Sequence, residues 1–304
     1  MSTTAVPTIT LNDGNTIPQL GFGVFQVRPE DTVEAVSQAL EAGYRHIDTA
    51  QMYGNEEEVG EAVEASDLDR SEIFVTSKLN NGFHEPEEAR AAFERTLSDL
   101  GLDYVDLFLI HWPLPTRYGG DYVSTWQTLE EFKSQGRSRS IGVSNFQPDH
   151  LERLASETDT TPAINQIESH PYLTNDSVRQ YCHEHGIAVE AWSPIAKGGV
   201  SDDTTISTIA ERVGKTPAQV VLRWHIQRDN IVFPKSVLPL ASARTLNCST
   251  SNSEPRTCGR STPWIWARTG APACTRTRST TYPVNRRPSR VPESGEDGVL
   301  LTRQ

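Results

Sequence analysis

The sequence has no long apolar run, and no stretch approaches the roughly 20 apolar residues that a membrane-spanning helix needs. Residues 1–11 also lack the pattern of a secretory signal peptide. From these two absences we expect a cytoplasmic protein with no membrane partner. At 304 residues, the chain is long enough for one large domain or two ordinary ones.

Lysine and cysteine are scarce, and basic residues are unevenly distributed. Residues 1–237 hold 36 Asp and Glu against 18 Lys and Arg, of which only five are lysines. Such an acidic surface argues against nucleic acid as a partner and suits an acidic proteome at high salt, or simple solubility. Residues 238–304 hold 4 acidic and 10 basic residues, and three of the four cysteines fall there. Because Cys182 is alone in the first part, we expect no disulfide framework in it.

Strand-like and helix-like segments alternate about every 30 residues through residues 1–237. The expected strands are 20–25, 44–49, 73–78, 105–111, 140–144, 164–168, 188–192 and 231–234. The expected helices are 29–42, 56–65, 86–100, 123–133, 149–156, 176–185 and 217–227. A turn signal at Asn12-Asp13-Gly14 adds an N-terminal β-hairpin. Eight repeats of this length predict an α/β fold, a (β/α)8 TIM barrel, rather than a doubly wound sheet.

Local signals support the same assignment. A doubly wound nucleotide-binding sheet requires a glycine fingerprint, and Gln26 stands where its third glycine should be. Asn55 followed by Glu58 predicts a capping box at the start of one helix. Thr216-Pro217 predicts the cap and first residue of the last helix.

Polar and aromatic side chains gather at the carboxyl ends of the expected strands. In a barrel these ends converge on one face, where active sites are built. Each residue alone has an ordinary explanation, since a lone His is more often structural and an Asp near a Lys is more often a simple ion pair. Only the convergence of the whole set indicates an active site. The set comprises Asp48, Lys78, His111, Trp112, Ser144, Asn145, Gln166, Trp192, Lys235 and Ser236.

Nine stretches between residues 7 and 237 resemble the aldo-keto reductases, most closely the short prokaryotic type that includes 2,5-diketo-D-gluconate reductases. They occur in the family's order and spacing, which makes a chance match implausible. The stretches are GFGVFQV (21–27), YRHIDTAQMYGNEEEVG (44–60), FVTSKL (74–79), DLFLIHWP (106–113), IGVSNF (141–146), NQIESHPY (165–172), AWSPIAKGG (191–199), TPAQVVLRW (216–224) and FPKS (233–236).

The resemblance implies a catalytic tetrad of Asp48, Tyr53, Lys78 and His111. Reducing a carbonyl by hydride leaves negative charge on its oxygen, which requires a proton donor and positive potential. A phenol with an ordinary pKa of about 10 is a reluctant acid, and we expect a buried Lys78 ammonium to lower the pKa of Tyr53. Asp48 would keep Lys78 charged, and His111 would orient the carbonyl. The expected reaction is NADPH-dependent reduction of aldehydes, ketones or keto-sugars to alcohols, with Tyr53 as proton donor.

The resemblance also implies the nicotinamide part of an NADPH site. Ser144, Asn145 and Gln166 match the residues that hold the nicotinamide carboxamide. Trp192 matches the aromatic residue that stacks on the nicotinamide ring, which is usually Tyr in this family. Because Trp offers the same stacking surface, the exchange leaves the expected site intact.

Lys235 and Ser236 match the start of the loop that holds the adenosine 2′-phosphate, which favours NADPH over NADH. Phe25 and Trp112 would line the substrate pocket, with ordinary core packing as the alternative for Phe25. The full set of expected cofactor-binding residues is Gly23, Val24, Ser144, Asn145, Gln166, Trp192, Ser193, Lys235 and Ser236.

Two other patterns carry less weight. Cys182-His183-Glu184-His185 contains metal-ligand residue types, but it lies late on an expected helix, away from the strand ends, so we expect no metal. Lys197-Gly198-Gly199 is too short for a phosphate-binding P-loop and resembles the family's cofactor-covering loop.

Residues 238–304 depart from the family pattern. The family continues with a helix whose Arg, Glu and Asn contact the 2′-phosphate and adenine, and those positions hold Ala241, Arg244 and Thr245. The segment is rich in Ser, Thr, Arg and Pro without periodicity, which predicts an irregular or disordered tail.

A shifted reading frame explains the departure. Codons can be chosen for residues 240–283 so that the shifted frame begins RIREN and resembles the family's carboxyl-terminal segment throughout. We therefore infer a frameshift near residues 238–240, with 1–237 the reductase barrel and 238–304 an aberrant tail.

Three functions fit the sequence. The first is a monomeric NADPH-dependent reductase of small-molecule carbonyl compounds. The second is a non-catalytic nucleotide-sensing subunit on the same fold, which the complete tetrad argues against. The third is an inactive product of a frameshifted reductase gene.

Overall fold

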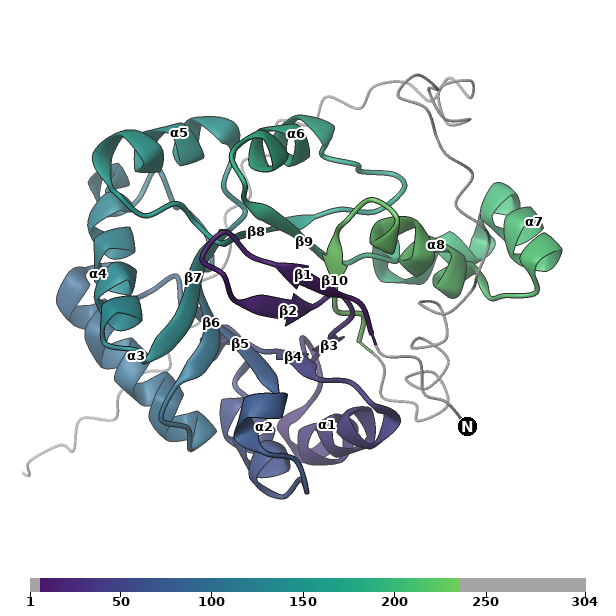
Figure 1. Cartoon of the computed structure of the whole chain (residues 1–304), viewed down its shortest axis with the longest axis horizontal. Coiled ribbons are helices and arrows are strands. Elements are labelled where there is room, and N and C mark those ends of the chain that lie inside the picture. Colours follow the sequence, from purple (N-terminus) through teal and green to yellow (C-terminus); the bar gives the residue numbers. More distant parts are fainter. Residues whose placement is uncertain (1–5, 236–304) are drawn as a thin grey trace, which may run out of the picture. The chain divides into compact units, whose positions relative to one another are not determined.

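The computed structural model describes residues 6–235, which are coloured in Figure 1. These residues belong to one compact unit. The expected tail, residues 238–304, and the expected cofactor residue Ser236 lie outside the described residues.

Eight parallel strands form one sheet in which neighbours along the chain are neighbours in space. They are β3 (Phe22–Gly23), β4 (His46–Asp48), β5 (Phe74–Leu79), β6 (Val105–Ile110), β7 (Ser138–Ser144), β8 (Ile164–Glu168), β9 (Ala188–Trp192) and β10 (Ile231–Val232). A parallel bridge between Leu20 and Val232 joins the two ends of the sheet. The strands therefore curl around a common axis, and the predicted (β/α)8 architecture is confirmed (Figure 1).

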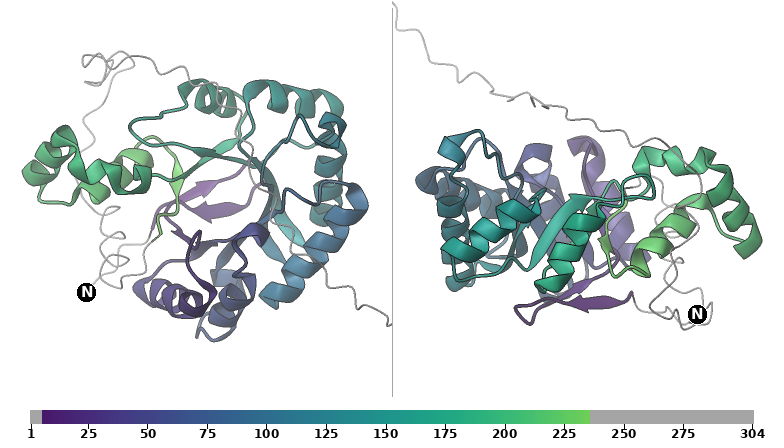
Figure 2. Two further views of the ribbon diagram at one scale, coloured as in Figure 1. Left: turned by 180° about the vertical axis from the view of Figure 1, so that it is seen from behind. Right: turned by 90° about the horizontal axis from the view of Figure 1, so that it is seen from above.

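Helices surround this sheet on its outer side (Figures 1 and 2). They are α1 (Pro29–Ala42), α2 (Glu56–Glu64), α3 (Pro86–Leu100), α4 (Val123–Ser134), α5 (Pro148–Glu157), α6 (Asp176–Glu184), α7 (Thr204–Val213) and α8 (Pro217–Ile226). Short 3-10 turns are η1 (Gln51–Tyr53), η2 (Arg70–Glu72), η3 (Tyr118–Gly120) and η4 (Ala196–Asp202). Between residues 6 and 235, no helix combines the length and apolar character of a membrane span.

The first residues of α8 and α2 can be compared with the helix caps predicted from the sequence. The Thr216 side chain accepts from the Gln219 amide and the Gln219 side chain accepts in return, so the cap predicted for α8 is confirmed. Asn55 precedes α2 as predicted, but the capping box is wrong because its side chain is used elsewhere. Its Nδ2 donates to Val24 O at 3.1 Å and Val27 O at 3.2 Å, tying the loop after β3 to the start of α2.

Helix α7 has no counterpart among the expected helices. Its sequence, TTISTIAERV, is rich in β-branched residues, which are weaker helix formers and obscure the periodicity. Two end signals were nevertheless present. The Asp203 side chain accepts a hydrogen bond from the Ile206 amide, and Gly214 ends the helix in the left-handed region.

The inside of the barrel is divided by depth. Since side chains alternate across a strand, residues two apart share the inner face. An apolar group fills the amino-terminal end: Phe74, Leu107, Leu109, Ile164 and Ile231 pack with Leu11 and Ile17. The last two belong to the hairpin of β1 (Thr8–Thr10) and β2 (Thr16–Pro18), which lies across that end of the barrel (Figure 1). The predicted N-terminal hairpin is thus confirmed, and it leaves the carboxyl ends of the strands uncovered.

Gly21 is required by a close approach of the His46 side chain. A Cβ at this position would lie 2.5 Å from His46 Nδ1, well inside contact distance. The imidazole is fully buried and its ring packs edge-on against Phe74, with 5.3 Å between the ring centroids. His46 therefore has little room to retreat.

We predict that Gly21→Ala lowers the free energy of unfolding by about 1–3 kcal/mol, the usual cost of overpacking a filled core. Urea denaturation of the two chains measures this difference. Gly199→Ala is the matched control, because its Cβ would meet nothing within 4 Å and the change should stay within about 0.5 kcal/mol. Equal stability of both variants would contradict the assignment.

Candidate active site

Lys78 is the centre of the polar residues at the carboxyl end of the barrel. Its side chain is fully buried on β5, and its ammonium has three donors to satisfy. Nζ donates to Asp48 Oδ1 at 2.7 Å, to the Thr49 carbonyl at 2.8 Å and to Tyr53 Oη at 3.3 Å. Three of the four expected tetrad residues are therefore in direct contact, brought together by β4, β5 and η1.

The buried pair of Asp48 and Lys78 perturbs both groups. Burial raises the pKa of Asp48 above its ordinary value, and the Lys78 charge offsets this only in part. Burial works to lower the pKa of Lys78, but the charges of Asp48 and Tyr53 outweigh it and raise that pKa. The ammonium thus keeps its proton at the bottom of the site.

The pKa of Tyr53 corrects one expectation. Burial raises the pKa of this phenol, while the Lys78 charge opposes the rise. The expectation of a net lowering is therefore wrong, although the contribution of Lys78 has the expected direction. The phenol holds its proton near neutral pH, as a donor must.

His111 lies beside the phenol. The His111 and Tyr53 ring centroids are 6.1 Å apart, with the rings nearly perpendicular. Burial, together with the Lys78 charge, lowers the pKa of His111 to about 3, so the imidazole is neutral. Its Nδ1 is buried and has no hydrogen-bond partner among residues 6–235. On the other side of the phenol, the Phe25 ring is 5.0 Å away and about half exposed.

A second chain of hydrogen bonds joins the ends of β7, β8 and β9. Trp192 Nε1 donates to Asn145 Oδ1 at 2.9 Å, and Asn145 Nδ2 donates to Ser144 Oγ at 3.0 Å. Ser144 Oγ in turn donates to the Gln166 carbonyl at 2.9 Å. Asn145 has a φ of 65°, a left-handed conformation that holds its side chain in this position. The structure thus brings these four expected cofactor residues together.

Gln166 links this chain to Lys78 and its partners. Its Nε2 donates to Asp48 Oδ2 at 2.9 Å and to Glu190 Oε2 at 2.8 Å. Glu190 and His46 are both fully buried and were missed by the sequence analysis. The signal was available, because His46 lies two residues before Asp48 and Glu190 lies two before Trp192, on the same strand faces.

The other expected residues occupy the same end of the barrel. A Cβ at Gly23 would lie 2.6 Å from the Phe233 carbonyl, so β3 and the end of β10 are in close contact there. The Val24 amide donates to the Asp48 carbonyl at 3.1 Å. Ser193 follows β9 with a φ of 49°, and Lys235 is exposed beyond β10. Trp112 is partly buried directly after His111.

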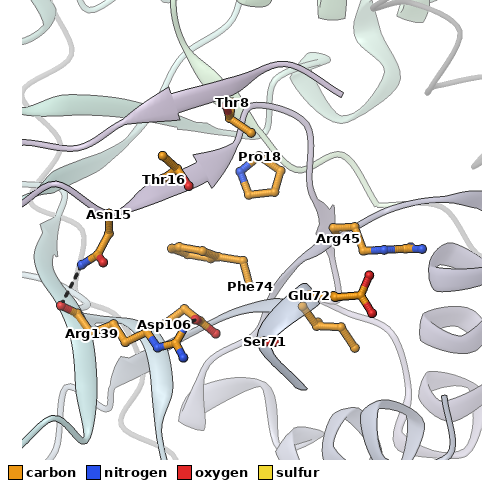
Figure 3. Close-up of a pocket in the computed structure, with 11 residues that line it drawn as sticks. Thr8, Asn15, Thr16, Pro18, Arg45, Ser71, Glu72, Phe74, Asp106 and Arg139 are labelled. Carbon is orange, nitrogen blue, oxygen red and sulfur yellow. Dashed lines mark hydrogen bonds and ion pairs between the residues drawn. The ribbon is translucent and has the colours of Figure 1, made fainter. Parts of the chain in front are cut away.

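Two features lie away from this site. Cys182 is buried on α6, where it accepts from Asn165 Nδ2, and residues 6–235 contain no cluster of three or more potential metal ligands. A pocket of about 240 Å³ lies at the opposite, amino-terminal end, between the hairpin and the strand starts (Figure 3). Its charged groups are already engaged, since Arg139 pairs with Asp106 at 3.3 Å and the Arg139 carbonyl accepts from Asn15.

A (β/α)8 barrel with a Lys–Asp–Tyr cluster at its carboxyl end has the architecture of a barrel enzyme. Residues 19–254 match the model of the aldo/keto reductase family, and the chain belongs to that family. It is 52% identical over 233 residues to an aldo-keto reductase of Mycolicibacterium smegmatis, spanning 77% of this chain and 84% of the relative. It is 47% identical over 233 residues to methylglyoxal reductase DkgA of Escherichia coli K12, spanning 76% and 83%.

The chain also superposes well on solved structures of similar sequence. The aldo/keto reductase from Brucella melitensis superposes with a TM-score of 0.79 at 49% identity, covering 83% of this chain and 94% of that one. A variant of Gox0644 in complex with NADPH superposes with a TM-score of 0.78 at 44% identity, covering 82% and 89%. The resemblance seen in the sequence is thereby confirmed.

We predict that Lys78→Met destabilises the fold by about 3–5 kcal/mol, because it leaves Asp48 buried without its partner. The double variant Lys78→Met/Asp48→Asn removes the charge as well and should recover part of this loss. In the single variant Asp48 has a raised pKa, so the folded state holds the proton and the deficit should shrink as pH falls toward 4. Urea unfolding at pH 4 and pH 7 measures both effects. Equal deficits in both variants, independent of pH, would contradict the buried ion pair.

Proposed function

We propose that this chain reduces aldehydes, ketones or keto-sugars to alcohols with NADPH, and that Tyr53 is the proton donor. One observation carries the proposal: a buried ammonium that contacts both a carboxylate and a phenol at the open end of the barrel. The comparisons support an NADPH-dependent oxidoreductase, since the family and the reductase relatives agree.

The chain's own residues would supply the proton that the reduction requires. The bound cofactor would supply the hydride. As negative charge develops on the substrate oxygen, Tyr53 Oη is placed to give it a proton, and Lys78 is placed to stabilise the phenolate that results. Asp48 keeps Lys78 charged and fixed. His111, whose neutral ring packs beside Tyr53, would donate a hydrogen bond from a ring nitrogen to the carbonyl and orient it.

The residues at the strand ends fit a nicotinamide carboxamide. Ser144 and Asn145 present polar side chains there, and the Trp192 ring is held by its hydrogen bond to Asn145. Both hydrogens of Gln166 Nε2 are used by carboxylates, so the atom of its side chain that can meet a carboxamide N–H is Oε1. Gly23, Val24 and Ser193 would complete this part of the site, and Lys235 with Ser236 would receive the 2′-phosphate.

The substrate class is inferred from the side chains at the entrance of the proposed site. The half-exposed Phe25 packs beside Tyr53 and Met52 precedes it, exposed, and Trp112 would add to this apolar surface, which suits small carbonyl compounds better than large charged ones. Relatives named methylglyoxal reductase fit this class. A nucleotide-sensing subunit on the same fold would have no need of the Lys78–Asp48–Tyr53 contacts, and we therefore favour catalysis.

We also propose that residues 1–237 are the reductase barrel and that residues 238–304 result from a frameshift. The family match ends at residue 254, whereas the chain continues to residue 304. The shifted frame would supply the Arg, Glu and Asn that the family uses for the 2′-phosphate and adenine. The chain as written would then carry its catalytic centre without the adenine-binding residues.

We predict that restoring the frame at codons 238–240 tightens NADPH binding by at least about tenfold, since each hydrogen bond to a charged group contributes roughly 1.5–3 kcal/mol. The free energy of unfolding should also rise, because each buried Phe, Leu or Ile contributes about 1.5–3 kcal/mol. Titration with NADPH and NADH, with urea unfolding, measures both. NADH should gain less, because it lacks the 2′-phosphate. Equal NADPH affinity of the two chains, or an unshifted gene at codon 239, would refute the frameshift.

We predict that Tyr53→Phe in the frame-restored chain lowers the turnover of a simple aldehyde by about 10²–10⁴-fold, the usual contribution of a general acid. NADPH affinity should change little, because the hydroxyl faces the substrate. Tyr104→Phe is the matched control, since Tyr104 packs under Arg70 and Arg139 at the other end of the barrel. A Tyr53→Phe variant that keeps more than a tenth of the rate would reject the assignment.

A further inference from the structure

Glu190 is a buried acid that the proposed reaction does not use. It lies on β9 with no exposure, facing His46 and Asp48 of β4, Lys78 of β5 and Gln166 of β8. Its Oε2 accepts from Gln166 Nε2 at 2.8 Å, and its Oε1 lies 3.6 Å from His46 Nε2 without a hydrogen-bond donor among residues 6–235. An acid in such a position must have a structural or functional reason to be retained.

The geometry of Gln166 supplies that reason. A side-chain amide can turn by half a rotation and exchange its donor and acceptor ends. Here Nε2 donates to two carboxyl groups on different strands, Asp48 at 2.9 Å and Glu190 at 2.8 Å. A flipped amide would set its oxygen against both of them. Asp48 is already occupied by Lys78, so Glu190 is the partner whose main contact is this amide.

We propose that Glu190 is a positioning residue that fixes the amide of Gln166 with Oε1 toward the cofactor, so that the site selects a carboxamide that can donate. The proposal rests on the proposed NADPH function. A ligand whose ring carries an acetyl group in place of the carboxamide can accept but not donate, and the fixed amide has only an acceptor to offer it.

His46 completes the arrangement. Burial and the Asp48 charge raise the pKa of Glu190 to about 8, while burial and the Lys78 charge lower the pKa of His46 to about 3. Near neutral pH the carboxyl therefore holds a proton and the imidazole is neutral. His46 Nε2 lies 3.2 Å from Thr76 Oγ1 and 3.6 Å from Glu190 Oε1. Because Oε2 already accepts from Gln166, the proton of the carboxyl belongs on Oε1, on the His46 side. Gly21 makes room for the imidazole in this place.

The first test needs no cofactor and uses the full chain. The exchange rate of the Gln166 side-chain NH2 with solvent is measured by NMR, with the signal assigned by its absence in Gln166→Met. We expect Glu190→Met to speed this exchange at least tenfold and Glu190→Gln, which still accepts through its oxygen, to leave it protected. Glu190→Val replaces Glu190→Met if the latter does not fold. Equal protection in all of these chains would overturn the proposal.

The second test compares the binding of NADP⁺ with that of its 3-acetylpyridine analogue in the same chains. In Glu190→Met the amide keeps only one of its two acceptors, Asp48, and turns more readily to donate to the acetyl oxygen. The preference for NADP⁺ should therefore fall by roughly three- to tenfold, the range of one neutral hydrogen bond. Glu190→Gln should keep the preference, which a merely structural role would not explain. An unchanged ratio in Glu190→Met overturns the selection. The binding measurements use the frame-restored versions of these chains. If the frame-restored chain with Glu190 intact binds neither dinucleotide, the proposed function fails, and the exchange measurement alone decides whether Glu190 holds the amide.

Discussion

A lysine ammonium with no access to solvent is the constraint on which the site depends. An unpaired charge in the interior costs several kcal/mol, so Lys78 can be retained only if every donor finds an oxygen. Asp48, the Thr49 carbonyl and Tyr53 meet that demand. Asp48 needs partners in turn, and Gln166 supplies one while itself engaging Glu190. The catalytic contacts and the expected cofactor contacts thus belong to one network of mutual requirements.

The depth of this network is set by the two-residue repeat of the strands. On β5 the inward positions run from Phe74 through Thr76 to Lys78, from apolar to charged. On β4 His46 and Asp48 lie at matching levels, paired in register with Phe74 and Thr76. The hairpin and the apolar group fill the amino-terminal end, and the charged residues lie at the carboxyl end. One periodic backbone therefore separates the part that stabilises the barrel from the part that performs chemistry.

Much of this could be predicted from the sequence, because strand ends and local motifs are short-range features. Helices α1 and α3 match the expected ranges, all eight strands occur where expected although β3, β4 and β10 are shorter, and Lys78 meets Asp48 and Tyr53 as the resemblance implies. The misses share a physical cause, which is competition from distant parts of the chain. Asn55 does not cap α2, because its Oδ1 accepts from Thr49 Oγ1 while its Nδ2 donates to carbonyls on the loop after β3. Burial outweighs Lys78 in setting the pKa of Tyr53. Neither effect is visible from neighbouring residues.

The hydrogen-bond partners of Lys78 and the expected carboxamide-binding residues come from different segments of the chain. Among residues 6–235, the side chains that hydrogen-bond to Lys78 come from β4 and η1, and the expected carboxamide-binding residues lie at the ends of β7, β8 and β9. None of these contacts draws on residues beyond Lys235. On the proposed function, the contacts to the 2′-phosphate and adenine would come from residues at and after Lys235. A change confined to that segment would then weaken dinucleotide binding, whereas the contacts of Lys78 with Asp48 and Tyr53 do not depend on it.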